Sequence, residues 1–142
     1  MSDNTEMAAL LARAEAILAQ RRTVAVVGVS SDPHKYGREV FDVLRPLHTV
    51  LPVNPRLAEV DGTPCYPSAE ALAQPVDVVV FAVNPELTER MVPAWLGRAP
   101  VLWLPPGCFT ERAAALAREG GAEVIVDLCP VFVTRRLAAR RG

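Results

Sequence analysis

The residues best suited to chemistry in this chain lie in one short stretch, residues 28–37, which reads GVSSDPHKYG. Two glycines bracket the stretch, two serines supply hydroxyls, and its lysine is the only lysine in the chain. These residues are Gly28, Ser30, Ser31, Lys35 and Gly37. Closely approaching backbone N–H groups with a cation beside them are suited to binding phosphate. The stretch therefore predicts a phosphate-binding loop, and the alternative is a strand-to-helix turn without a ligand.

The elements on either side fit such a loop. Residues 23–29 are mostly small and β-branched, which is typical of a strand buried on both faces of a parallel sheet. After Gly37, apolar residues recur at helical spacing at Val40, Phe41, Leu44 and Leu47. The loop differs from the G-x-G-x-x-G dinucleotide fingerprint, because Ser30 takes the place of the second glycine. In addition, Gly37 follows Gly28 by nine positions instead of five.

The rest of the chain repeats this alternation of strand and helix. Four further strands are predicted, at residues 48–53, 76–83, 101–104 and 122–126. A helix within residues 1–22 precedes the first strand. Together these elements predict a Rossmann-like α/β fold, with a doubly wound five-stranded parallel sheet in the order 3-2-1-4-5 and helices on both faces.

Local signals fix several of the intervening segments. Asn84 and Thr110 are predicted N-caps, the second for a helix that runs through Glu119. Pro93 should kink or end the first of these two helices. Residues 57–67 are predicted to be irregular, and residues 68–73 to form a short helix. Residues 135–141 are predicted to be a short basic tail.

Length and composition limit the class of protein. A chain of 142 residues with 51% hydrophobic residues predicts a single domain, residues 1–142. A net charge of −1 gives no reason to expect a nucleic-acid partner. No apolar run approaches the length of a membrane span, and the first residues are not basic. Cys65, Cys108 and Cys129 form no C-x-x-C pair, which favours reduced thiols and a cytoplasmic location.

The strand ends indicate which nucleotide the loop would accept. Ligands of such sheets bind outside the carboxyl ends of the strands. An NAD site usually has a carboxylate after the second strand, but here Asn54, Pro55 and Arg56 follow it, with no carboxylate before Glu59. Arg56 and Lys35 instead favour a ribose that carries a phosphate, as in NADP or coenzyme A.

Six segments together resemble the CoA-binding protein family: VAVVGVSSDPHKYGREV, LPVNP, VDGTPCYPSAEAL, VDVVVFAVNPE, VLWLPPG and VIVDLC. Its members are small single-domain Rossmann proteins, similar to the CoA-binding domains of succinyl-CoA synthetase α subunits and acyl-CoA synthetases. The resemblance covers about residues 24–129, and it departs at Pro105, where the family commonly has glutamine. It implies that coenzyme A or an acyl-CoA binds at the carboxyl edge of the sheet. The implied binding residues are Gly28, Val29, Ser30, Ser31, Lys35, Tyr36, Gly37, Val53, Asn54, Pro55, Arg56, Val83, Asn84, Pro85, Pro106 and Gly107.

The sequence offers little for catalysis. Its two histidines, His34 and His48, belong to no Ser-His-Asp set or metal-spaced cluster, and no paired carboxylates are apparent. We therefore expect a binding module without catalysis of its own. The alternatives are an NADP-binding reductase, or a subunit of one, and a redox or interaction protein that uses a cysteine. The sequence leaves a protein partner and a homo-oligomer open.

Overall fold

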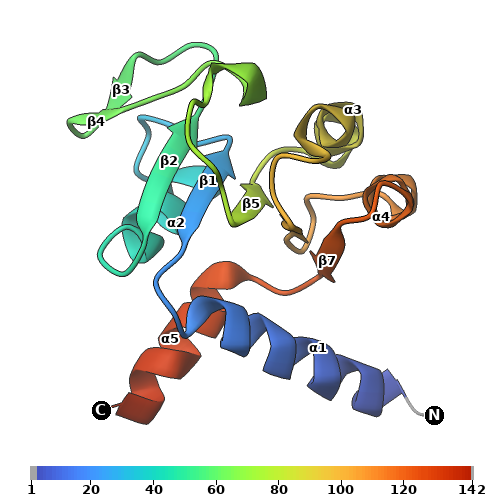
Figure 1. Cartoon of the computed structure of the whole chain (residues 1–142). Helices are drawn as coiled ribbons and strands as arrows, with labels where there is room; N and C mark the ends of the chain where they lie inside the picture. Colours follow the sequence, from blue (N-terminus) through green and yellow to red (C-terminus); the bar gives the residue numbers. More distant parts are fainter. Residues whose placement is uncertain (1–2, 142) are drawn as a thin grey trace.

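The chain is built around one parallel sheet. The computed structural model describes residues 3–141 (Figure 1). Its main sheet has five strands in the order β2-β1-β5-β6-β7. In chain order they are β1 Thr23–Val27, β2 Thr49–Val53, β5 Val78–Phe81, β6 Val101–Leu104 and β7 Glu123–Val126. All neighbouring pairs are parallel. The predicted Rossmann-like α/β class is confirmed.

The predicted strand order needs one correction. A 3-2-1-4-5 pattern is present, but its third place, outside β2, is held by a single residue, Tyr66, which bridges Val53 in parallel. The strand predicted as third, residues 76–83, is β5, which pairs with β1 on the opposite side from β2. The topological switch therefore lies between β1 and β5.

The edge at Tyr66 is too short to be recognised in the sequence. The Tyr66 N–H donates to the Pro52 carbonyl at 2.9 Å, and its carbonyl accepts from the Asn54 N–H at 2.9 Å. Pro64 and Pro67 flank it, and neither has an N–H to extend a ladder. A rudimentary edge of this kind leaves no run of strand-forming residues.

Helices cover both faces of the sheet. One face is covered by α1 Asp3–Leu18, α2 Tyr36–Leu44 and α5 Pro130–Arg141, and the other by α3 Pro85–Trp95, α4 Glu111–Glu119 and the 3₁₀ turn η1 Ala69–Ala71. Strand β1 shows the two-sided burial, because Val24 and Val26 enter one core while Ala25 and Val27 enter the other. In Figure 1, α1 and α5 lie side by side at the base of the molecule.

The connecting segments differ from prediction in two places. Residues 57–67, expected to be irregular, contain a small antiparallel hairpin of β3 Glu59–Val60 and β4 Thr63–Pro64. The basic tail at residues 135–141 is the second half of α5, which begins earlier because Val131 and Val133 are buried against the sheet. The predicted helix within residues 68–73 is the short turn η1.

Candidate functional site

A hollow of about 420 Å³ opens at the carboxyl edge of the sheet. It lies where the loop after β1, the first turn of α2, the end of β5 and the turn after β6 meet. Its lining residues are Gly28, Ser30, Lys35, Tyr36, Gly37, Ala82, Val83, Asn84, Gly107 and Cys108. The phosphate-loop candidate therefore forms one wall of this hollow.

Half of the predicted site residues line this hollow directly: Gly28, Ser30, Lys35, Tyr36, Gly37, Val83, Asn84 and Gly107. Two other lining residues, Ala82 and Cys108, were not in the predicted set. Both adjoin predicted residues in sequence, and the signal for them was only their place at a strand end. Ala82 lies beside the loop because β5 is the neighbour of β1, which the predicted strand order did not anticipate.

The remaining predicted residues lie outside the lining. Val29 and Val53 are buried in the core, with 0% and 1% of their surface exposed. Pro55, Arg56 and Pro106 are exposed at the same edge of the sheet. The others outside the lining are Ser31, Asn54 and Pro85.

Asn54 joins the loops that follow β1 and β2. Its Nδ2 donates to the Val29 carbonyl at 2.8 Å, and its Oδ1 accepts from the Arg56 N–H at 2.8 Å. Both polar ends of the side chain are therefore used within the protein. Asn54 holds the turn that carries Arg56 beside the loop that carries Lys35.

Two glycines allow the first helix to pack onto the first strand. Gly28 has φ +96°, and a Cβ placed on it would overlap the Ala82 carbonyl and the Val83 side chain. A Cβ on Gly37 would overlap the Gly28 carbonyl. Gly37 therefore allows the close helix–strand contact that the third glycine of the G-x-G-x-x-G fingerprint allows, although Gly37 follows Gly28 by nine positions.

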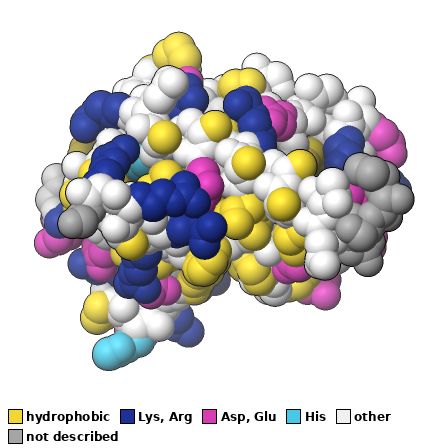
Figure 2. Space-filling model, turned by 90° about the horizontal axis from the view of Figure 1, so that it is seen from below, with side chains coloured by type: hydrophobic (Ala, Val, Ile, Leu, Met, Phe, Trp, Pro, Cys, Tyr) yellow, Lys and Arg dark blue, Asp and Glu magenta, His cyan; other side chains and the backbone are white. Residues whose placement is uncertain are grey.

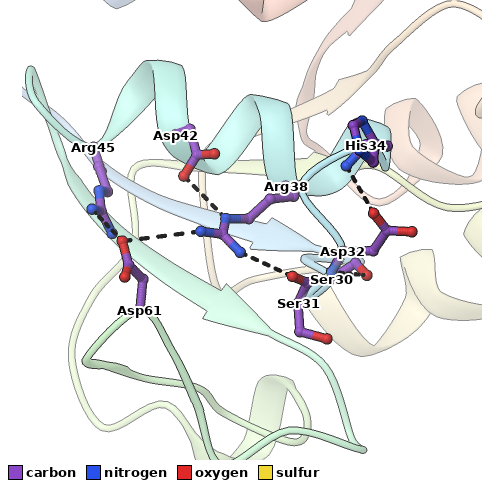
Figure 3. Close-up of polar contacts among 8 residues, drawn as sticks. All are labelled: Ser30, Ser31, Asp32, His34, Arg38, Asp42, Arg45 and Asp61. Atoms are coloured by element: carbon purple, nitrogen blue, oxygen red, sulfur yellow. Dashed lines mark hydrogen bonds and ion pairs between the residues drawn. The ribbon is translucent and has the colours of Figure 1, made fainter.

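The long loop between these glycines is folded by its own side chains (Figure 3). Ser30 Oγ accepts from the Asp32 N–H at 3.0 Å, and Asp32 Oδ1 accepts from the His34 N–H at 2.9 Å. The Lys35 N–H donates to the Asp32 carbonyl at 3.1 Å. These turns bring the chain to the start of α2.

Arg38 fastens the loop to the rest of the molecule. Its Nη1 donates to the Ser31 carbonyl at 3.2 Å, and its Nε pairs with Asp42 at 3.1 Å. Asp61, on the β3–β4 hairpin, lies 4.0 Å from Arg38 Nη2 and 2.7 Å from Arg45 Nη2. Figure 3 shows the Arg38 side chain between the loop, α2 and the hairpin.

The N-terminus of α2 has no side-chain cap. Its N-cap residue is Lys35, whose side chain is exposed and makes no capping bond. A lysine has no acceptor to offer, so the N–H groups of the first turn are not satisfied in this way. The positive end of the helix dipole and the Lys35 ammonium point to an anion at this end of the hollow.

The phenol of Tyr36 and the thiol of Cys108, both at this edge, have raised pKa values. The Tyr36 hydroxyl lies 3.1 Å from Cys129 Sγ, and burial, followed by this contact, raises the pKa of Tyr36 far above its usual value. Burial also raises the pKa of the Cys108 thiol. A thiol with a raised pKa is a poor nucleophile, because the thiolate is the reactive form.

The part of the chain that the structure describes holds no group of three or more His, Cys, Asp or Glu residues that could bind a metal ion. None of its helices is long and apolar enough to cross a membrane. What the edge does offer is a concave surface with backbone donors and a cation.

Comparisons with known proteins agree with this geometry. Residues 22–135 match the CoA binding domain family. Protein YneT of Bacillus subtilis, which is uncharacterized, is 31% identical over 115 residues, or 80% of this chain and 85% of YneT. Acetate–CoA ligase (ADP-forming) I of Archaeoglobus fulgidus is 36% identical over 72 residues, which are 50% of this chain but 10% of the ligase.

A solved structure agrees along most of the chain. A hypothetical protein from Pyrococcus horikoshii superposes with a TM-score of 0.84 at 29% identity, covering 90% of this chain and 92% of that protein. The family match and the shared fold extend over the same elements that build the hollow. This chain belongs to the CoA binding domain family.

Proposed function

We propose that this protein binds coenzyme A or an acyl-CoA at the carboxyl edge of its sheet and has no catalysis of its own. The observation that carries the proposal is the uncapped, lysine-bearing start of α2, packed through glycines onto the end of β1. Membership of the CoA binding domain family supports the choice of ligand.

The close packing around two glycines bears on whether coenzyme A would fit this edge of the sheet. Coenzyme A needs a place where its diphosphate can approach backbone N–H groups without meeting side chains. Gly28 and Gly37 make that approach possible, because a Cβ on either would displace the backbone of the cradle. We assign the diphosphate to this cradle, with the loop around Ser30 and Ser31 and the first-turn N–H groups of α2 as its donors.

Two cations at this edge are suited to binding the phosphate on the ribose of coenzyme A. Lys35 lies at the rim of the hollow, and Arg56 is on the adjoining turn that Asn54 ties to the loop. We propose that both face the 3′-phosphate of coenzyme A. Tyr36 and Pro55 would flank the phosphoadenosine end.

The opposite wall would guide the rest of the ligand. Val83, Asn84 and Gly107 line the hollow from the ends of β5 and β6. Pro85 and Pro106 adjoin them, and we assign these turns to the pantetheine arm.

The absence of catalysis remains part of the proposal. The ADP-forming ligase that this chain resembles extends far beyond the matched tenth of its length, and its activity is not transferred here.

Calorimetric titration with coenzyme A, 3′-dephospho-coenzyme A and NADP tests the assignment. A hydrogen bond to a charged group is worth about 1.5–3 kcal/mol, less where solvent screens it. We therefore expect coenzyme A to bind roughly tenfold to a hundredfold more tightly than the dephospho form. Lys35→Ala and Arg56→Ala should each narrow this ratio, and so should added salt. Arg90→Ala, an exposed arginine on α3, is the matched control and should leave the ratio unchanged.

Two outcomes would contradict the choice of ligand. Equal affinity for coenzyme A and its dephospho form would mean that neither cation recognises the 3′-phosphate. The ribose phosphate of NADP is on the 2′ oxygen, so tighter binding of NADP than of coenzyme A would favour the reductase alternative. Steady product formation from acetate, ATP and coenzyme A by the purified chain would contradict the absence of catalysis.

A further inference from the structure

A second cavity, of about 300 Å³, lies at the amino edge of the sheet, opposite the proposed coenzyme A site. The end of α1, the turn before β2 and one side of α5 enclose it. Its lining includes three leucines, Leu18, Leu47 and Leu137, and two arginines, Arg21 and Arg141. Among the described residues that line it, none is Asp or Glu. Apolar side chains and positive charge therefore meet in one hollow.

The apolar part of the lining reaches the surface at the turn before β2. Leu47 is 42% exposed there, whereas Leu18 and Leu137 pack against the core. A volume near 300 Å³ is at the lower end for ligand pockets, so the cavity has room for one large apolar side chain and not for a nucleotide. A partner that covers Leu47 with such a side chain gains free energy from the apolar surface removed from water.

The arginines around the cavity carry more positive charge than nearby carboxylates neutralise. Arg136 and Arg140 share one carboxylate, that of Glu15, at 2.7 and 3.0 Å. Arg21 and Arg141 each make one long hydrogen bond of 3.4 Å, in both cases to a neutral oxygen. The whole chain has a net charge of −1, so this positive excess is local and not a result of composition.

The positive charge also acts on the wall of the cavity. His48 is buried beside it, and burial, followed by the charges of Arg21 and Arg22, lowers the pKa of this histidine. In Figure 2, Lys and Arg side chains are most numerous in the left half, on the side where α5 ends in Figure 1, with hydrophobic atoms among them. This surface therefore favours an acidic partner.

The shape of the site distinguishes between two kinds of acidic partner. A lipid surface is bound by an apolar face that projects into the headgroups, but here the apolar side chains lie inside a hollow. A hollow receives a side chain that projects from the partner. In peptide recognition a buried apolar anchor supplies most of the affinity, and charges at the rim supply specificity and speed of association.

We propose that this cavity is the docking site for an acidic peptide segment of a partner protein, which inserts one large apolar side chain beside the leucines and places flanking carboxylates against Arg21 and Arg141. The five residues of β1 separate this site from the proposed coenzyme A site by roughly 17 Å. A partner docked at the amino edge therefore leaves the carboxyl edge open. The inference does not depend on which ligand binds there.

Selection from a displayed library of random peptides, with the full chain as target, tests the proposal. We expect the enriched peptides to carry one Leu, Met or Phe with Asp or Glu on both sides. The same selection against the double variant Arg21→Glu/Arg141→Glu should not enrich them. A synthetic peptide of the enriched sequence, labelled for fluorescence polarisation, then gives dissociation constants.

Single substitutions locate the contacts. Arg21→Glu and Arg141→Glu should each weaken binding of the synthetic peptide about tenfold, because an attraction becomes a repulsion. Leu47→Ser should also weaken it about tenfold, through the loss of apolar contact at the rim. Arg112→Glu, exposed on α4, and Phe132→Ser, 52% exposed on α5, lie outside the lining. They are the matched controls and should leave the affinity unchanged.

Vesicles of phosphatidylglycerol and coenzyme A are the comparison ligands, and neither should displace the peptide. The proposal is overturned if no acidic peptides with an apolar residue are enriched, or if all three variants keep the affinity of wild type. Displacement by the vesicles would make the surface a membrane site, and displacement by coenzyme A would merge the two sites. Self-association of the chain that Arg141→Glu abolishes would identify a second copy as the occupant and overturn it as well.

Discussion

The helices α2, α3 and α4 all begin at the carboxyl edge of the sheet, but they begin in two different ways. On α3 and α4, Asn84 and Thr110 accept hydrogen bonds from the N–H groups of Leu87 and Ala113, at 2.8 and 3.0 Å. On α2 the corresponding residue is Lys35, which makes no such bond. Where a side chain caps the helix, its anion-binding capacity is used within the protein. At α2 no side chain uses that capacity in this way.

The largest expected effect comes from forcing a side chain into the cradle beneath α2. Gly28→Ala should lower the free energy of unfolding by about 3 kcal/mol or more, because the Cβ meets the Ala82 carbonyl as well as a positive φ. Coenzyme A binding should be lost in the folded fraction. Chemical denaturation and calorimetry measure the two quantities.

Gly97→Ala separates packing from backbone strain. Gly97 has φ +82°, but a Cβ placed on it would meet no atom within 4 Å. Its substitution should cost only the strain, about 1–2 kcal/mol, and leave the affinity unchanged. Equal losses of stability for the two variants would contradict the close packing of the loop on β5.

The next effect follows from capping α2 as α3 and α4 are capped. Lys35→Asp supplies an N-cap acceptor, which should raise the free energy of unfolding by about 0.5–1 kcal/mol. It should also lower the affinity for coenzyme A roughly tenfold to a hundredfold, because a carboxylate then occupies the anion site. Lys35→Ala removes the charge without adding a cap and should lose less affinity. Denaturant titration and calorimetry measure both changes.

The reverse change on α4 is the control for Lys35→Asp. Thr110→Ala removes a cap and a 2.7 Å bond to Glu89, so it should cost about 1 kcal/mol of stability. Affinity for coenzyme A should not change, since Thr110 is not part of the hollow. Loss of both properties in this variant would remove the distinction between the two kinds of helix start.

The smallest effect is a pH dependence at the first residue of α2. The pKa of Tyr36 is raised in the folded protein by burial and by Cys129, above about 10 in the unfolded chain. Stability from this group is therefore complete below pH 10 and is lost as pH rises, because only the unfolded state ionises. Denaturation between pH 9 and 10.5 should show a steeper loss for wild type than for Tyr36→Phe. Parallel curves would contradict the prediction.

Local chemistry predicted the starts of two helices correctly, those of α3 and α4. Asn84 and Thr110 are caps as expected, and the helix from Thr110 ends at Glu119 before Gly120. These features depend on neighbours within a few residues, which a sequence displays. Pro93 did not end α3, which continues to Trp95. Val92 and Trp95 are buried, and that packing depends on residues distant in sequence.

The candidate site was predicted only in part for the same reason. The residues of the loop itself, such as Ser30 and Lys35, were recognised from their types and spacing. Ala82 was not, because its place beside Gly28 depends on β5 pairing with β1.

The fastening of the loop by Arg38 and Asn54 has a consequence for the thermodynamics of binding. A loop held to Asp61, Asp42 and β2 through these side chains has already lost much of its conformational freedom during folding. A ligand that binds there has little further ordering to impose, so more of its interaction free energy appears as affinity. Most of the loop's conformational entropy is therefore lost when the chain folds and not when a ligand binds.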